Sequence, residues 1–106
     1  MEDIALKVQS IRDYLSKQFP ESKVEAFQDG GHSGPFVFRL DHGQNGNVLH
    51  RAIVPSEVMR DLTVAHILDC LSRWDLAARL RESGKQPVVV TREGLQVETQ
   101  LANPSR

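Results

Sequence analysis

Apolar residues recur every three or four positions through the first part of the chain, which is the spacing of one face of a helix. These positions are Ile4, Val8, Ile11, Leu15 and Phe19. The pattern predicts an amphipathic helix from Glu2 to Gln18, and Pro20 ends it because a proline ring cannot continue a helix. The polar residues between the apolar ones, Lys7 among them, are expected to face solvent, and Leu6 is the one apolar residue outside the stripe.

Apolar and polar residues alternate in the next three segments, which is the period of a half-buried strand. The segments are Lys23–Gln28, Phe36–Leu40 and Val48–Val54. In the second segment the residues predicted to face the core are Phe36, Phe38 and Leu40. In the third segment the larger aliphatic residues indicate that the core-facing set is Leu49, Arg51 and Ile53. The connection between these two segments is rich in glycine and asparagine, which tolerate a positive φ, and it predicts an antiparallel hairpin.

A second helical pattern follows the third strand. Pro55 and Ser56 end that strand and start a short helical turn through Asp61. Thr63 is placed to cap a longer helix that Gly84 closes, and the buried stripe of this helix has helical spacing. The stripe consists of Val64, Ile67, Leu68, Leu71, Trp74 and Ala78. A further apolar strip lies on a different side of the same helix and is a candidate interface with another subunit. Its members are Leu62, Leu76 and Leu80.

The last apolar segments are Val88–Thr91 and Leu95–Thr99, and a glycine before the second one predicts a hairpin with a bulge at Gly94. The order α-β-β-β-α-β-β predicts an α+β two-layer sandwich, with two helices packed on one face of a mostly antiparallel sheet. We expect residues 1–100 to form a single domain and residues 101–106 to form a flexible tail. The other face of the sheet is left to water or to a partner.

Composition fits this fold class and excludes others. The chain has 106 residues, of which 40% are hydrophobic and 25% charged, the balance of one globular domain and not of a disordered chain. No apolar run reaches the roughly 20 residues that cross a bilayer, and the acidic amino terminus does not resemble a secretion signal. The single cysteine, Cys70, permits no internal disulfide, so we expect a reducing cytoplasm. The net charge of -1 lacks the basic excess usual in proteins that bind phosphate backbones.

A glycine-rich turn from Asp29 to Pro35 is the candidate binding loop. Its candidate residues are Gly30, Gly31, His32, Ser33 and Gly34. A nucleophile elbow needs a serine between two glycines at a strand-to-helix turn, whereas here a proline and then a strand follow. The P-loop and dinucleotide fingerprints are absent from the sequence as well. We therefore expect no catalytic residue in this turn and retain it only as a contact loop.

Histidine and cysteine spacings match no compact metal motif. His66 and Cys70 stand four positions apart on one predicted helix, but two ligands do not form a site. We expect neither a metal ion nor a cofactor. A basic patch is the remaining candidate, and it forms if the hairpin register brings its members together. The members are Arg39, His50 and Arg51.

Over residues 1–83 the order of a helix, three antiparallel strands and a helix, with Gly34 and Pro35 before the second strand, resembles the topology of the double-stranded RNA-binding domain. That family carries lysines at the start of its second helix, where they hold phosphates. This chain has Ser56-Glu57-Val58-Met59-Arg60-Asp61 at that place. The resemblance is therefore one of topology and implies no RNA binding.

Two functions from different classes remain. The first is a small cytoplasmic, non-enzymatic binding or assembly module that associates with itself or binds a protein partner. The candidate contact surfaces are the sheet edge, the final hairpin and the second apolar strip of the long helix. The alternative is a nucleic-acid-binding module that uses the exposed sheet face and the loops at 29–35 and 42–47. An enzyme that uses His32 and Ser33 is the least favoured, because no catalytic constellation accompanies these two residues.

Overall fold

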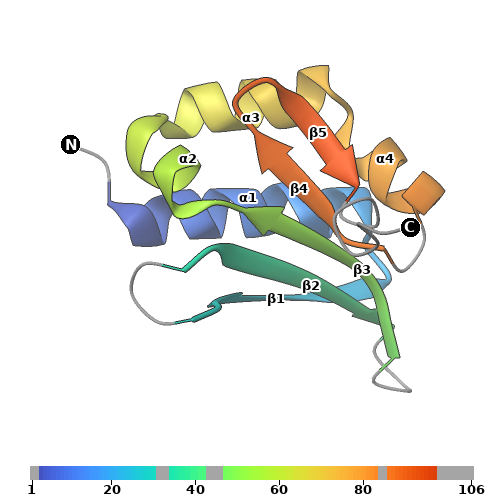
Figure 1. Cartoon of the computed structure of the whole chain (residues 1–106). Coiled ribbons are helices and arrows are strands. Elements are labelled where there is room, and N and C mark those ends of the chain that lie inside the picture. The colour runs from blue at the N-terminus through green and yellow to red at the C-terminus, as the bar shows by residue number, and fades with distance from the viewer. Residues whose placement is uncertain (1–2, 31–33, 43–46, 84–85, 98–106) are drawn as a thin grey trace, which may run out of the picture.

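Four helices and one five-stranded sheet form the described part of the chain in the computed structural model (Figure 1). The structure describes residues 3–30, 34–42, 47–83 and 86–97. The helices lie on one side of the sheet, which confirms the predicted α+β fold class. None of these described helices is both long and apolar enough to cross a lipid bilayer. The predicted tail at 101–106 lies outside the described residues. The elements in chain order are α1 (Ile4–Gln18), β1 (Ser22–Gln28), β2 (Phe36–His42), β3 (Asn47–Val54), α2 (Ser56–Asp61), α3 (Val64–Arg73), α4 (Leu76–Ser83), β4 (Val88–Thr91) and β5 (Gly94–Val97).

The sheet has the order β1-β2-β3-β4-β5, so each strand lies beside the next one in the chain. All neighbouring strands are antiparallel except β3 and β4, which run parallel with Ala52 opposite Val88. A parallel pair needs a crossover connection, and α2, α3 and α4 supply it between β3 and β4. The first three strands and the final hairpin are thereby joined into one mostly antiparallel sheet, as predicted.

An apolar core fills the space between the helices and the sheet. On β2, Phe38 and Leu40 are 0% exposed and Phe36 packs against them partly buried, which confirms the core set predicted for this strand. The largest fully buried side chains come from both layers. They are Phe38, Ile11, Leu15, Leu40, Met59, Leu71, Leu76, Leu80, Val54 and Val88.

The core-facing side of β3 differs from the prediction. Ala52 and Val54 face the helices at 0% and 1% exposure, whereas Arg51 is exposed and Ile53 is only partly buried on the opposite face. The side chain of Leu49, the third residue of the predicted set, lies outside the described part of the structure. The small side chain at Ala52 lets α4 pack closely on β3, so the size of the aliphatic residues was the wrong criterion here.

The long helix predicted from Thr63 to Gly84 is divided into α3 and α4. Thr63 caps α3 as predicted, because its hydroxyl oxygen accepts a hydrogen bond from the backbone N–H of His66 at 3.1 Å. The chain then turns at Asp75, whose φ of 54° lies in the left-handed region that aspartate tolerates better than most residues. Asp75 Oδ1 accepts a hydrogen bond from the N–H of Ala78 at 3.3 Å and helps to start α4. This turn resets the helical phase between the two helices.

The predicted interface strip is wrong for this reason. Leu76 and Leu80 are 0% exposed and belong to the core, and Leu62 is partly buried against it. In an unbroken helix Leu76 and Leu80 would lie apart from the buried stripe, but after the turn at Asp75 they point inward together with Ala77. Leu76 and Leu80 are therefore not accessible to a partner while the protein is folded.

Lys7 is buried, although the helical pattern predicted an exposed position for it. Its residue exposure is 5%, and its Nζ donates hydrogen bonds to the carbonyl oxygens of Met59 at 2.7 Å and Arg60 at 3.5 Å. These carbonyls belong to the last turn of α2, where the helix offers them no N–H and its dipole favours a cation. Lys7 therefore caps α2 from a position 52 residues earlier in the chain.

Replacing Lys7 by methionine should lower the free energy of unfolding by about 1–3 kcal/mol, because the apolar stem is kept while the buried carbonyl of Met59 and the partly buried carbonyl of Arg60 lose their donor. Urea unfolding followed by circular dichroism measures the change. Lys17→Met is the matched control, since Lys17 is an exposed residue of the same helix, and it should change stability by less than about 0.5 kcal/mol. Equal effects of the two substitutions would mean that the bonds from Lys7 contribute nothing.

Candidate functional site

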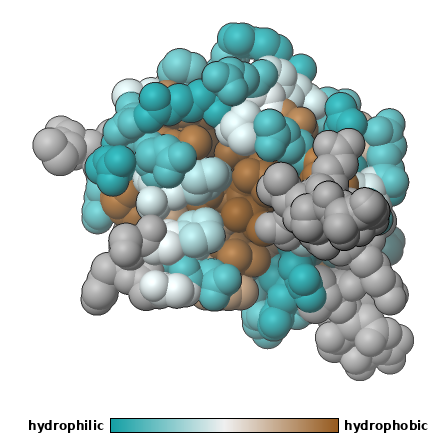
Figure 2. Space-filling view, viewed as in Figure 1, coloured by the Kyte–Doolittle hydropathy of each residue, from teal (hydrophilic) through white to brown (hydrophobic). Residues whose placement is uncertain are grey.

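A row of apolar side chains crosses the sheet on the face turned away from the helices. Phe27 of β1 is paired with Val37 of β2, and Val37 is paired with Ile53 of β3. The parallel partner of Ile53 on β4 is Val89. Side chains alternate between the two faces along a strand, and the neighbours of these four residues point toward the helices. We name the four residues the apolar row, which is about 14 Å long at the usual strand spacing. Figure 2 shows apolar surface gathered in the middle of the view, with polar side chains along part of its edge.

Exposure differs along the apolar row. Phe27 at the edge of the sheet is 46% exposed, whereas Val37 between its neighbours is 7% exposed. Among the described residues, Phe27 and Leu6 are the large hydrophobic residues with exposed side chains. A single exposed leucine such as Leu6 is ordinary on a protein surface. Phe27, in contrast, continues a connected apolar row, which is typical of a contact site.

A row of charged side chains lies beside the apolar row, two residues along each strand. Its members, Glu25, Arg39 and Arg51, face one another in register across β1, β2 and β3. Arg39 Nη2 donates to Glu25 Oε1 at 2.5 Å, and its Nε lies 3.4 Å from Asp41 Oδ1. The hydrogen bond from Arg39 lowers the pKa of the Glu25 carboxyl below its usual value. We name Glu25, Arg39 and Arg51 the charged row, in which the charge of Arg39 is already balanced.

Arg51 differs from Arg39 because no carboxylate balances it. It is exposed, and no residue in the described ranges forms an ion pair or a hydrogen bond with its side chain. Its register partner is Arg39, and like charges directly opposite on neighbouring strands repel each other. A guanidinium can donate two parallel hydrogen bonds to a carboxylate. Arg51 is therefore the residue of this face that most favours an anionic group.

The two rows border an open hollow of about 360 Å³. Apolar side chains form one side of the hollow and guanidinium groups form the other. A partner surface that carries both apolar and anionic side chains would therefore fit it. The hollow is open to solvent and lacks the enclosure that a small substrate needs. It is lined by Phe27, Asp29, Val37, Arg39, Arg51, Ile53 and Pro87.

The candidate binding loop begins beside this hollow. At the base of the loop, the backbone N–H of Asp29 donates to the carbonyl oxygen of Pro35 at 2.8 Å. Gln28 Nε2 donates to the carbonyl oxygen of Gly34 at 2.9 Å, which ties the same two strand ends together. The base is thus fixed by hydrogen bonds. The role of the loop as a contact stays a prediction, because three of its residues lie outside the described ranges. These are Gly31, His32 and Ser33.

His50 is separated from the two arginines of the predicted basic patch. It points to the helix side of β3, where its ring lies 5.3 Å from the ring of Phe19 in a tilted arrangement. The guanidinium of Arg81 lies over the same Phe19 ring, 4.6 Å from its centre. The structure therefore brings Arg39 and Arg51 together and places His50 on a different surface.

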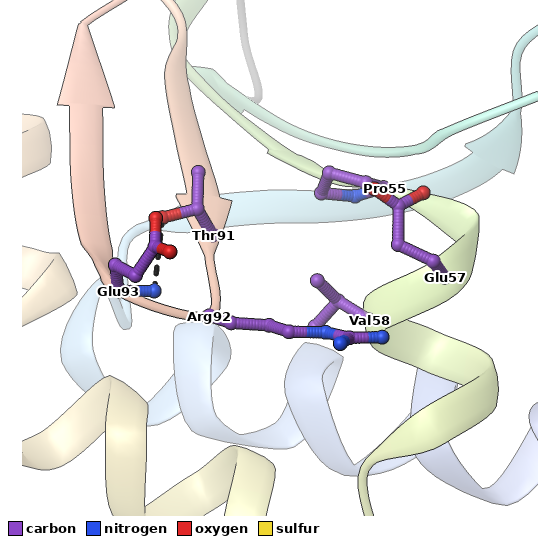
Figure 3. Close-up of a pocket in the computed structure, with 6 residues that line it drawn as sticks. All are labelled: Pro55, Glu57, Val58, Thr91, Arg92 and Glu93. Carbon is purple, nitrogen blue, oxygen red and sulfur yellow. Dashed lines mark hydrogen bonds between the residues drawn. The ribbon is translucent and has the colours of Figure 1, made fainter.

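A second hollow lies between the β4–β5 turn and the start of α2 (Figure 3). Its lining residues are Pro55, Glu57, Val58, Thr91, Arg92 and Glu93. The polar groups here are already engaged in local structure. The Thr91 hydroxyl donates to the carbonyl of Gly94 at 2.7 Å and accepts from the N–H of Glu93 at 3.2 Å. Arg92 extends toward α2 and forms an ion pair with Asp61. These contacts hold the turn against α2, so we assign this hollow a structural role.

Metal ligands and nucleophiles do not converge in the described part of the chain. No group of three or more histidine, cysteine, aspartate or glutamate side chains there is arranged to hold a metal ion. His66 is exposed, whereas Cys70 is buried, and burial raises the pKa of the Cys70 thiol. A thiol with a raised pKa stays protonated at neutral pH, which disfavours metal binding and nucleophilic attack.

The sequence pattern did not reveal the apolar row. The core set predicted for the second segment puts Val37 on the side away from the core, but Ile53 was assigned to the core and Phe27 to neither side. The missing information was the register, because only pairing across four strands brings these residues into one row.

Comparison with known proteins yields no match to a family model, a curated protein or a solved structure. The face of the sheet that is turned away from the helices, which we name the open face, is therefore the basis of the proposed function.

Proposed function

We propose that this chain is a small, non-enzymatic binding or assembly module that takes a protein partner on the open face of its sheet. The apolar row is the observation that carries this proposal. The solvated face of an antiparallel sheet is normally polar, whereas here apolar side chains continue across four strands. Covering such a row with a partner is favourable because apolar surface is removed from water.

The partner that fits this face combines apolar side chains with a carboxylate. The apolar side chains would cover the apolar row, and the carboxylate would meet Arg51, which has no ion-pair partner among the described residues. Arg39 contributes less, because Glu25 and Asp41 already balance its charge. Apolar centres bordered by arginine are common in protein interfaces.

We place this role in the cytoplasm. The one cysteine of the chain, Cys70, is buried, and the fold depends on no internal disulfide. A fold of this kind tolerates reducing conditions, which supports the proposed compartment.

Phe27→Asp should reduce the capture of a partner protein at least about tenfold, because a carboxylate replaces the most exposed member of the apolar row. The measurement is an affinity pull-down from an extract of the native host, with the full chain as bait and mass spectrometry as the readout. Leu6→Asp is the matched control, since Leu6 is 52% exposed but lies on α1, and this bait should keep the same proteins.

Partners in this experiment are proteins retained by the wild-type and Leu6→Asp baits and lost from the Phe27→Asp bait. Circular dichroism of each bait verifies that it is folded. If all three baits retain the same proteins, the open face is not the binding surface.

The alternative function is nucleic-acid binding through the same face. Phe27 and Arg51 line one hollow, and a base stacked on an exposed aromatic ring beside a guanidinium is a common contact in single-strand binding. The carboxylates of Glu25, Asp29 and Asp41 on this face make it less favourable for a phosphate backbone. Fluorescence anisotropy with a labelled oligonucleotide tests it. Binding that weakens steeply with salt and with Arg51→Ala would support it, and no anisotropy change at low salt would exclude it.

A further inference from the structure

We propose that the partner on the open face is a second copy of this chain, bound face to face about a two-fold axis that runs along β2. This inference rests on the proposed function, because it names the partner of the same surface. Its basis is the order of residues across β1, β2 and β3, which are neighbours in the sheet.

The charged rows of two copies are complementary when the copies are related by a rotation of 180° about an axis parallel to β2. Glu25 of β1 and Arg51 of β3 lie on either side of Arg39 of β2. A rotation of 180° about β2 exchanges β1 and β3. It therefore places Glu25 of one copy over Arg51 of the other, and the reciprocal contact forms at the same time. One rotation thus creates two identical ion pairs, and Arg39 lies on the axis over the second Arg39, where Glu25 and Asp41 of each chain balance the two like charges.

The apolar row matches itself under the same rotation. Phe27 exchanges places with Ile53, so each aromatic ring meets a β-branched side chain of the other copy. Val37 lies on the axis and faces the second Val37. Two stacked sheets lie about 10 Å apart, a distance that side chains of this size fill. Phe27, which is 46% exposed in one chain, is withdrawn from water by this contact.

Glu25 can accept the contact although two cations of its own chain already approach it. Its side chain is 38% exposed, with Arg39 at 2.5 Å and Lys23 Nζ at 3.5 Å. An ionised carboxylate has about four acceptor positions, so room remains for a further donor. Arg51 gains in return the carboxylate that the described part of its own chain does not supply.

A two-fold axis along the apolar row would not give this match. Such a rotation keeps each strand over itself and brings Arg51 over the opposite side of the apolar row. The carboxylate on that side is Asp29, which continues β1 and lines the same hollow. It lies two strands from Arg51, about 10 Å to the side at the usual strand spacing. The axis along β2 is therefore the one that gives Arg51 a carboxylate.

The proposed contact is small, so we expect a reversible dimer. The five strands span only about 19 Å, and β1, β2 and β3 alone overlap in this arrangement. Interfaces with less than about 1,200 Å² of total buried area are typical of weak association. Monomer and dimer should therefore exchange with concentration.

Sedimentation velocity of the full chain over a range of concentrations tests the inference. The wild-type chain should dimerise as concentration rises. Arg51→Glu and Glu25→Arg should each weaken dimerisation about tenfold or more, because each puts like charges opposite one another at two places. An equimolar mixture of these two variants should restore a dimer, since the mixed dimer holds one native and one reversed ion pair. Arg79→Glu and Glu82→Arg are the matched controls, because they change exposed residues of α4 by the same charges and should leave dimerisation unchanged.

The restored dimer would also show that both variants fold. Because Glu25→Arg removes a partner of Arg39 as well, Arg51→Gln serves as a milder test that leaves Glu25 and Arg39 in place. It should weaken dimerisation less than Arg51→Glu, and no weakening at all would overturn the inference.

Three further outcomes separate this inference from the proposed function. A wild-type dimer that the mixed variants do not restore would show that the axis does not lie along β2. A strictly monomeric wild-type chain that still captures another protein through Phe27 would keep the proposed function and reject the second copy. A monomeric chain whose pull-down is the same with Phe27→Asp would reject both.

Discussion

Leu80→Ala should lower the free energy of unfolding by about 2–5 kcal/mol. Leu80 is 0% exposed and belongs to the core between the helices and the sheet. Its truncation loses the free energy of removing the side chain from water and leaves a cavity that the neighbours fill only in part. Urea unfolding measures the loss as a shift of the midpoint, provided that the slope of the transition is unchanged.

Leu6→Ala is the control for this experiment, since it makes the same chemical change at a helical leucine that is 52% exposed. It should change stability by less than about 0.5 kcal/mol. A Leu80→Ala protein as stable as the Leu6→Ala protein would contradict the packing of α4 on the sheet. Small domains are stable by only about 5–15 kcal/mol, so the expected loss is a large share of the total.

Gly34→Ala should cost about 3 kcal/mol or more. A Cβ at this position would lie 1.5 Å from the carbonyl oxygen of Asp29 and 2.7 Å from its carbonyl carbon. Because both are backbone atoms, the turn between β1 and β2 must shift to admit the methyl group. The shift weakens the bonds from Asp29 to Pro35 and from Gln28 to Gly34. Urea unfolding gives the size of the loss, and faster hydrogen exchange at the Asp29 amide locates it.

Gly30→Ala is the matched control in the same turn. Gly30 has a φ of 81°, but a Cβ built there has no atom within 4 Å. The substitution should therefore lower the free energy of unfolding only by the strain of holding an alanine in the left-handed region, about 1–2 kcal/mol. Equal losses at Gly30 and Gly34 would show that the close approach at Gly34 has no energetic weight.

The alternation of residues was sufficient to predict the first three strands, because Phe36, Phe38 and Leu40 carry a clear period of two and turn residues separate the segments. The same signal failed for β3, where Ala52 and Val54 face the helices while Ile53 belongs to the apolar row. A strand that is apolar on both faces does not indicate which face is the core. The ambiguity of β3 was thus itself a sign that both faces of the sheet carry apolar residues.

The break between α3 and α4 had no sequence signal of the usual kind. Neither glycine nor proline occurs at the turn, and Asp75 adopts a left-handed conformation that its side chain supports. A helical period counted across such a turn assigns every later residue to the wrong face. This is why Leu76 and Leu80 were expected at the surface and are found in the core.

The candidate site could be predicted only in pieces. Arg39 and Arg51 were predicted to meet only if the hairpin register brought them together, and the apolar row and the charged row depend on the pairing of separate strands. The difference between the two arginines depends on it as well, because Glu25 reaches Arg39 from β1. Residue types suggest which groups are available, whereas register decides which of them remain without a partner.

The cap from Lys7 to α2 links the beginning of the chain to a segment that is synthesised later. Lys7 and Met59 are 52 positions apart, a stretch that a ribosome adds in about 3 to 10 s at 5–20 residues per second. During that interval α1 leaves the ribosome before the helices and strands that cover its apolar stripe. A helix of 15 residues is only marginally stable alone. α1 is therefore made before the segments that complete its packing, and its apolar stripe stays uncovered in the nascent chain until they follow.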